Sequence, residues 1–228
     1  FHAAIEQTVV PAAQRVLERR RQRLGLEATR PWDRGVDQFG RPTLRPAETV
    51  AELNSKTLNV FEQVDPIFRK YYQSMMDHDL LDLDSRKNKA SGAYSVGYNV
   101  ANLPMIFMSH TNTMSDVEII LHEGGHAFHA FECAHLRFHQ KAETYVPAEF
   151  AEVASMGMEL LASPYLTKEC GGFFTEEESA RARISHMEAI ITFWPYMALV
   201  DAFQHWIYEN HEEASDGQRC EEKWGELW

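Results

Sequence analysis

Apolar residues recur every three to four positions along most of this chain, which is the spacing of one buried helix face. Residues 1–25 follow this pattern, with arginines between the apolar positions, and Pro11 predicts either a kink or the true start of the helix. A second helix is expected over about 48–63. Asp65–Pro66, a cap followed by a proline at the first helical position, predicts a third helix that ends near His78. These patterns indicate a mainly α fold.

Two runs of a different character interrupt the helices. Ala93 to Tyr98 is rich in aromatic and β-branched residues, and Pro104 to Met108 follows it closely. We therefore expect a small β-sheet with strands near 93–99 and 104–109. Because proline has no N–H for a sheet ladder, Pro104 favours an edge strand for the second run.

The second half of the chain contains three further helix starts. Ser115 with Glu118 fits a capping box, which predicts a helix running to about Ala134. A proline at 147 opens the next helix, and Ser163–Pro164 closes it. A second capping box, Thr175 with Glu178, heads a long helix that is expected to end near Asn210, and a short helical piece follows Asp216–Gly217.

Composition and charge narrow the function classes. The formal net charge of −12 argues against a nucleic-acid binder, which needs a basic face. The longest mainly apolar run, 189–200, is well short of the roughly 20 residues that span a bilayer, so no membrane partner is expected. No charged-then-apolar leader opens the chain, and the spacings of Cys133, Cys170 and Cys220 fit no disulfide framework. We expect a cytoplasmic protein with three free thiols.

The clustered histidines are the strongest candidates for a functional site. Six of the eleven histidines fall between His110 and His139, and His122-Glu123-Gly124-Gly125-His126 lies within an expected helix. On a helix, two histidines four positions apart share one face and can bind a single Zn²⁺, while the intervening glutamate can reach a water on the metal. Two adjacent glycines cost a helix roughly 1 kcal/mol each relative to alanine, so they indicate close approach of another backbone.

A third zinc ligand is expected in the helix after the proline at 147. Three acidic residues compete for this role, Glu149, Glu152 and Glu159, and all lie near one helix face. Spacing alone does not choose among them. The apolar neighbours of these residues predict a helix packed on the core, where an inward carboxylate needs a partner such as a metal.

These motifs resemble the active-site core of the thimet oligopeptidase and oligoendopeptidase F family of zinc metallopeptidases, in particular its bacterial oligoendopeptidase branch. The resemblance is carried by segments along nearly the whole chain: His122 to His129, Phe150 to Ser155, Lys89 to Ser95, Pro104 to Met108 and Trp194 to Trp206. It implies a helical zincin-type catalytic domain that binds one zinc ion.

The resemblance also assigns roles to individual residues. It implies His122, His126 and Glu152 as the zinc ligands and Glu123 as the general base for a metal-activated water. Glu159 matches a further acidic position and could orient a ligand histidine, as outer-shell carboxylates do. His129 could act beside it. Further candidates bind substrate: Ala93 and Tyr94 in the glycine-containing loop and strand, His110 after the second strand, and Pro104 to Met108 as the edge that receives the peptide.

The function implied is endopeptidase cleavage of short peptides. The family places an oxyanion-stabilising tyrosine segment near its C-terminal end, which Tyr196 and Tyr208 do not match. We therefore interpret residues 1–228 as a single partial catalytic domain, expected to lack that segment and an N-terminal helical region. Two alternatives stay open: a zinc-containing, non-catalytic peptide-binding domain, and a zinc carboxypeptidase of similar helical build.

Overall fold

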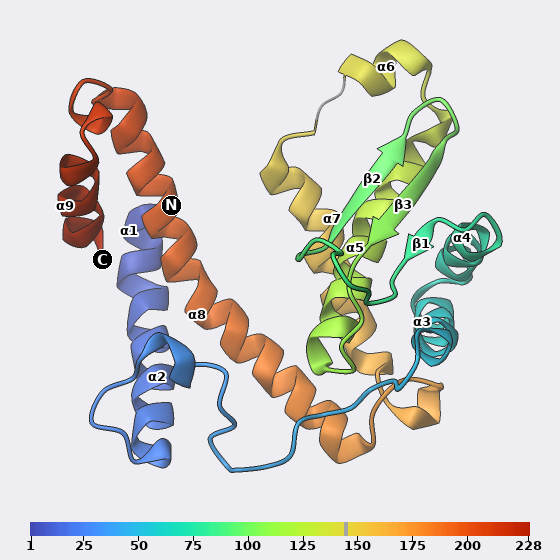
Figure 1. Cartoon of the computed structure of the whole chain (residues 1–228), viewed down its shortest axis with the longest axis horizontal. Helices are drawn as coiled ribbons and strands as arrows, with labels where there is room; N and C mark the ends of the chain where they lie inside the picture. Colours follow the sequence, from blue (N-terminus) through green and yellow to red (C-terminus); the bar gives the residue numbers. More distant parts are fainter. Residues whose placement is uncertain (144–145) are drawn as a thin grey trace. The chain divides into compact units, whose positions relative to one another are not determined.

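A computed structural model describes residues 1–143 and 146–228. It is mainly α-helical with one three-stranded sheet, as the sequence predicts (Figure 1). The chain divides into two compact units, one formed by Phe1–Pro42 with Arg183–Trp228 and the other by Thr43–Ala182. This division concerns packing, so the expectation of a single partial catalytic domain stays a prediction.

The first unit opens with α1 (His2–Ala4), a π-helical turn (Ile5–Val9) and α2 (Val10–Leu24). Pro11 explains the π-helical turn, since a proline ring clashes with the carbonyl four residues earlier in a regular α-helix. The N–H of Val10 bonds the carbonyl of Ile5 instead. The regular α-helix therefore begins beside Pro11, which is one of the two predicted outcomes. Gly25 ends it with a φ of 65°, a conformation that suits glycine.

The rest of this unit comes from the C-terminal half. Helix α8 (Glu176–Glu209) begins in the second unit and continues in the first, and α9 (Gly217–Leu227) follows it. Thr175 and Glu178 form the predicted capping box, because the backbone N–H of each is bonded by the side chain of the other. Asp216 caps α9 by accepting from the N–H of Gln218. The helix starts expected here are therefore confirmed.

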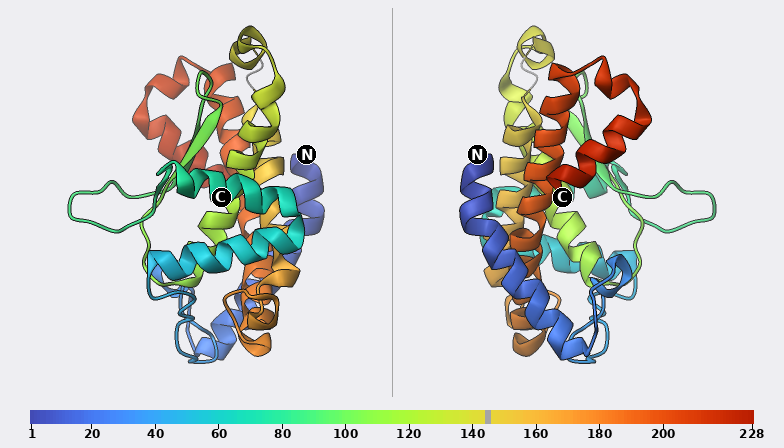
Figure 2. Two further views of the ribbon diagram at one scale, coloured as in Figure 1. Left: turned by 90° about the vertical axis from the view of Figure 1, so that its right-hand side faces the viewer. Right: turned by 90° about the vertical axis from the view of Figure 1, so that its left-hand side faces the viewer.

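The second unit holds most of the secondary structure. Its helices and strands are α3 (Val50–Val64), α4 (Pro66–Asp77), β1 (Leu81–Asp82), β2 (Tyr94–Tyr98), β3 (Leu103–Phe107), α5 (Met114–Glu132), α6 (Phe138–Glu143) and α7 (Ala148–Ala162). Short 3-10 turns lie at Cys133–His135, Ser163–Tyr165 and Lys168–Cys170 in this unit, and at Pro31–Asp33 and Glu213–Ser215 in the first unit. The long loop between β1 and β2 is prominent in Figure 2.

The strand order corrects one expectation. The order is β1-β3-β2, so β3 is the central strand and β2 is an edge, whereas Pro104 to Met108 was expected to form the edge. The two-residue strand β1 pairs in parallel with only Ile106 and Phe107, so Pro104 lies before the part of β3 that β1 covers. The proline is tolerated there, and a strand as short as β1 leaves no periodic pattern in the sequence.

The start of α5 also differs from the prediction. Thr113, not Ser115, is the N-cap, and the carboxylate of Asp116 accepts from the N–H groups of Thr113 and Thr111. The two capping patterns, two residues apart, share the same spacing. Asp116 is 1% exposed and satisfies two backbone donors that would otherwise be unpaired, which favours the earlier start.

Core packing in the second unit holds α5 in place. Helices α3 and α4 run side by side across α5 (Figure 2). The rings of Phe61 on α3 and Phe128 on α5 meet edge to face with centroids 4.7 Å apart, and Tyr72 of α4 contacts Phe61. On another side, α5 packs along β2 and β3. Helix α5 is thereby held between a helical layer and a sheet.

The cysteines and the apolar character of the helices were both addressed by the sequence predictions. Cys133, Cys170 and Cys220 are all free thiols, as expected. Within the described residues, none of the helices combines the length and the apolar character that a membrane crossing requires.

Candidate active site

Close backbone contact between α5 and α7 creates the site. A Cβ atom at Gly125 would lie 2.4 Å from the carbonyl oxygen of Ala154 and 2.6 Å from the Cα of Ser155, so only glycine fits there. At Gly124 a Cβ would lie 2.6 Å from the ring of Phe61, on the α3 side. The two glycines therefore face two different neighbours, and the backbone approach expected from the sequence is found.

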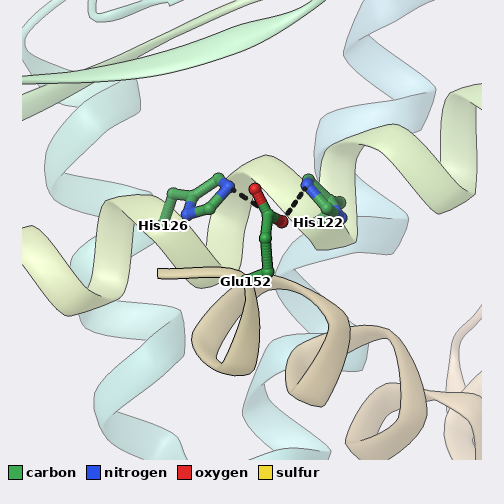
Figure 3. Close-up of side chains that lie close together, drawn as sticks. All are labelled: His122, His126 and Glu152. Carbon is green, nitrogen blue, oxygen red and sulfur yellow. Dashed lines mark ion pairs between the residues drawn. The ribbon is translucent and has the colours of Figure 1, made fainter. Parts of the chain in front are cut away.

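This crossing brings three potential metal ligands together. His122 and His126 project from adjacent turns of α5, and the carboxylate of Glu152 on α7 lies between their rings (Figure 3). Oε2 of Glu152 lies 3.2 Å from Nε2 of His122 and 3.6 Å from Nε2 of His126. One ligand atom from each residue falls within 4.8 Å of the others, and in the described part of the chain no other such group of three occurs.

A second carboxylate from α7 holds His122 from the opposite side. Oε1 of Glu159 lies 2.6 Å from Nδ1 of His122, and the Glu159 side chain is 13% exposed. An ionised carboxylate only accepts hydrogen bonds, so Nδ1 carries the proton and Nε2 is directed toward Glu152. The hydrogen bond to Glu159 is the main cause that raises the pKa of His122, and burial opposes it.

Glu123 is buried beside this group. It is 7% exposed, and burial raises the pKa of its carboxyl, helped by the negative charge of Glu152. The charge of His122 and a hydrogen bond from the backbone N–H of Ser95 act in the opposite direction. Ser95 belongs to β2, so the edge strand of the sheet faces this glutamate. A carboxyl with a raised pKa next to candidate metal ligands suits proton transfer near neutral pH.

The donor set fits a zinc ion. Two imidazole nitrogens and one carboxylate oxygen form the three-ligand set of catalytic zinc sites, which leaves one position open. Burial lowers the pKa of His126, which favours the neutral imidazole that a metal requires. Glu149, the remaining acidic candidate for the third ligand, has a side chain outside the described residues.

The predicted substrate-binding residues lie at β2 and beside the start of α5. Ala93 directly precedes β2 and Tyr94 begins it, and the ring of Tyr94, 49% exposed, stacks on Phe107 with centroids 4.9 Å apart. The His110 side chain is 10% exposed, with Nδ1 2.9 Å from Oδ2 of Asp116. It therefore packs against the start of α5 and offers little surface to a substrate.

His129 is the last of the predicted site residues. His129 follows His126 by one helical turn, and its charge is among the causes that lower the pKa of His126. The sequence predictions missed two contacts, the Ser95 N–H on Glu123 and the hydroxyl of Ser155, which lies 2.6 Å from Oε2 of Glu152. A serine three residues after Glu152 on an apolar helix was the signal for the second. A backbone N–H leaves none.

The family model and the similar solved structures define the class of protein. The chain belongs to peptidase family M3, whose family model matches residues 1–228. Among solved structures, it is similar to PZ peptidase A with an inhibitor, at 28% identity and a TM-score of 0.86, covering 100% of this chain and 39% of that one. It is also similar to a putative oligoendopeptidase F from Bacillus anthracis, at 25% identity and a TM-score of 0.86, covering 99% of this chain and 40% of that one.

A curated relative agrees with these structures. The chain is 26% identical to an oligoendopeptidase F homologue of Mycoplasma genitalium over 144 residues, which cover 62% of this chain and 23% of the relative. The chain thus spans less than half of the length of the proteins it matches. The resemblance to the oligoendopeptidase F family and the mainly helical fold class are both confirmed.

Proposed function

We propose that this chain carries the catalytic centre of a zinc-dependent oligoendopeptidase, which hydrolyses internal bonds of short peptides. The observation that carries the proposal is the grouping of His122, His126 and Glu152 around one point with Glu123 buried beside them. Membership of peptidase family M3 and the similarity to proteins named oligoendopeptidase F support the same activity.

One zinc ion would be held by Nε2 of His122, Nε2 of His126 and the carboxylate of Glu152. When bound, zinc supplies Lewis acidity, which polarises a carbonyl oxygen and lowers the pKa of water. Glu159 fixes the ring of His122 by accepting from Nδ1, so the nitrogen that faces Glu152 is the basic one.

Glu123 is the proposed general base and general acid. Its carboxylate accepts a proton from water as the oxygen of that water adds to the carbon of the scissile carbonyl, and then gives the proton to the departing amine nitrogen. The overall reaction adds water across one amide bond. The raised pKa of the Glu123 carboxyl makes it a better proton acceptor than an exposed glutamate, and the N–H of Ser95 orients the carboxylate.

The edge of β2 is the proposed platform for the substrate backbone. An extended peptide can add to an exposed strand edge through main-chain hydrogen bonds. Because β3 is central, β2 replaces Pro104 to Met108 in this role. Ser95 on β2 bonds to Glu123, so a peptide along this edge would pass next to the general base. Ala93, directly before β2, and Tyr94, the first residue of β2, stay the proposed substrate contacts.

Cleavage of an internally quenched peptide tests the proposal. The complete polypeptide that contains this chain should cut the peptide internally, and Glu123→Gln should keep zinc while losing about 10²–10⁴-fold in rate. Glu177→Gln, an exposed position at the start of α8, is the matched control and should leave the rate unchanged.

Mass spectrometry of the products separates the alternatives. Release of single C-terminal residues would indicate the carboxypeptidase. Peptide binding with zinc but without cleavage would indicate the non-catalytic domain. Cleavage retained in Glu123→Gln would reject the assigned base.

A further inference from the structure

Ser155 lies in the contact between α5 and α7 and is completely buried, with an exposed fraction of 0%. Its hydroxyl oxygen is 2.6 Å from Oε2 of Glu152 and 3.1 Å from the backbone carbonyl oxygen of the same residue. A hydroxyl has one proton to donate. The shorter contact, to a charged acceptor, is the stronger hydrogen bond, so the proton goes to the carboxylate.

The serine is fixed by its surroundings, whereas the glutamate is not. The Cα of Ser155 lies where a Cβ on Gly125 would come within 2.6 Å, so the two backbones lock its position. The Glu152 side chain, by contrast, is 42% exposed and belongs to a residue type with many rotamers. A rigid donor thus holds a side chain that solvent would otherwise leave free to turn.

The atom that accepts this bond is also the one that faces the imidazoles. Oε2 of Glu152 lies 3.2 Å from Nε2 of His122 and 3.6 Å from Nε2 of His126. Serine in a helix ordinarily bonds a backbone carbonyl three or four residues earlier. Here the hydroxyl also reaches the side chain of that residue, and thereby selects the carboxylate orientation that meets the two rings.

We propose that Ser155 is a positioning residue, whose hydroxyl holds the Glu152 carboxylate in the orientation that completes the metal site. The inference rests on the proposed zinc centre and adds to it a residue outside the ligand set. Loss of an outer-shell hydrogen bond of this kind commonly weakens metal binding by about 10- to 100-fold.

Zinc affinity, measured by competition with a chromophoric chelator on the full chain, tests the inference. Ser155→Ala should weaken zinc binding by about 10- to 100-fold relative to the wild type. Ser179→Ala is the matched control, because Ser179 is a helical serine, 1% exposed, whose hydroxyl oxygen has no hydrogen-bond partner in the described structure. It should bind zinc as the wild type does.

Two further measurements separate positioning from a purely structural role. In a Glu152→Ala background, Ser155→Ala should cause no additional loss of zinc affinity. Metal-free Ser155→Ala should melt cooperatively, within a few degrees of Ser179→Ala.

Three results would overturn the inference. The first is wild-type zinc affinity in Ser155→Ala. The second is a loss of zinc affinity on Ser155→Ala that is as large in the Glu152→Ala background as in the wild type. The third is loss of the fold in metal-free Ser155→Ala. A folded wild type that binds no zinc would instead refute the proposed metal centre, so the two failures are distinguishable.

Discussion

Nδ1 of His122 lies 2.6 Å from Oε1 of Glu159, while Nε2 of the same ring faces Glu152. Both carboxylates come from α7, where seven residues, or two helical turns, separate them. One helix therefore places a carboxylate beside each nitrogen of a single imidazole. The ring can neither rotate nor change tautomer without losing the hydrogen bond from Nδ1 to Glu159, which is the preorganisation that a metal ligand requires.

Replacement of Glu159 tests this arrangement. Because Glu159 is the main cause of the raised pKa of His122, Glu159→Gln should lower that pKa in the metal-free chain and weaken zinc binding by about 10- to 100-fold. A titration of the His122 ring by NMR measures the first effect. Glu177→Gln should change neither quantity, and an unshifted His122 titration in Glu159→Gln would reject the arrangement.

The helix crossing at Gly125 is expected to be intolerant of a single methyl group. In Gly125→Ala the new Cβ would meet backbone atoms of Ala154 and Ser155, which side-chain rotation cannot relieve. We expect a loss of about 1–3 kcal/mol in the free energy of unfolding and weaker zinc binding, since α7 must move away from α5. Chemical denaturation and a zinc titration measure the two.

A glycine on α7 provides the control for this prediction. A Cβ at Gly157 would meet nothing within 4 Å, so Gly157→Ala should be neutral or stabilising by up to about 1 kcal/mol through helix propensity. Equal effects of the two substitutions would contradict the proposed role of the crossing.

Because Glu123 is buried, its replacement by glutamine is expected to raise the stability of the metal-free protein in a pH-dependent way. The folded-state pKa of Glu123 is raised above its ordinary value of 4.5, so its contribution to stability is complete below that pH and is lost as pH rises through the folded-state pKa. Metal-free Glu123→Gln, which cannot ionise, should therefore be more stable than the wild type at pH 7. The difference should shrink as pH falls through the folded-state pKa of Glu123 and should vanish below 4.5. Thermal melts across pH 4–8 measure it, and a Glu123→Gln chain less stable at pH 7 would contradict the assignment.

The loop between β1 and β2 depends on one buried lysine. The Lys89 side chain is 2% exposed, and its ammonium group donates to the carbonyl oxygens of Asp82, Asp84 and Met108 and to the carboxylate of Asp82. Lys89→Met should cost about 1.5–3 kcal/mol in the free energy of unfolding, because these acceptors lose a charged donor. Lys87→Met, at an exposed position of the same loop, should stay within about 0.5 kcal/mol of the wild type. Equal stability of the two variants would show that Lys89 does not stabilise this loop.

The sequence predicts which residues of α5 carry the chemistry, but it does not predict which helix packs against them. The spacing of His122 and His126 determines that they share a helix face, and the adjacent glycines indicate a close neighbour. Neither property identifies the partner helix. From the residues alone Glu149, Glu152 and Glu159 were equivalent, and only the family resemblance selected Glu152, which the structure then brings beside the two histidines.

Other features have no local signal in the sequence. The central position of β3 depends on pairing with β1, whose two residues are too few to show a period. The true cap of α5 depends on the burial of Asp116, which no capping pattern reports. Such features are set by tertiary contacts, so they become visible only in the folded chain.

Equilibrium zinc binding to the wild type and to Glu152→Ala tests the proposed metal centre. We expect one zinc ion per wild-type chain, with tight binding lost in Glu152→Ala, although that variant keeps both histidines. Folded wild-type protein that binds no zinc, or a Glu152→Ala variant that binds it as tightly as the wild type, would contradict this assignment of the ligands.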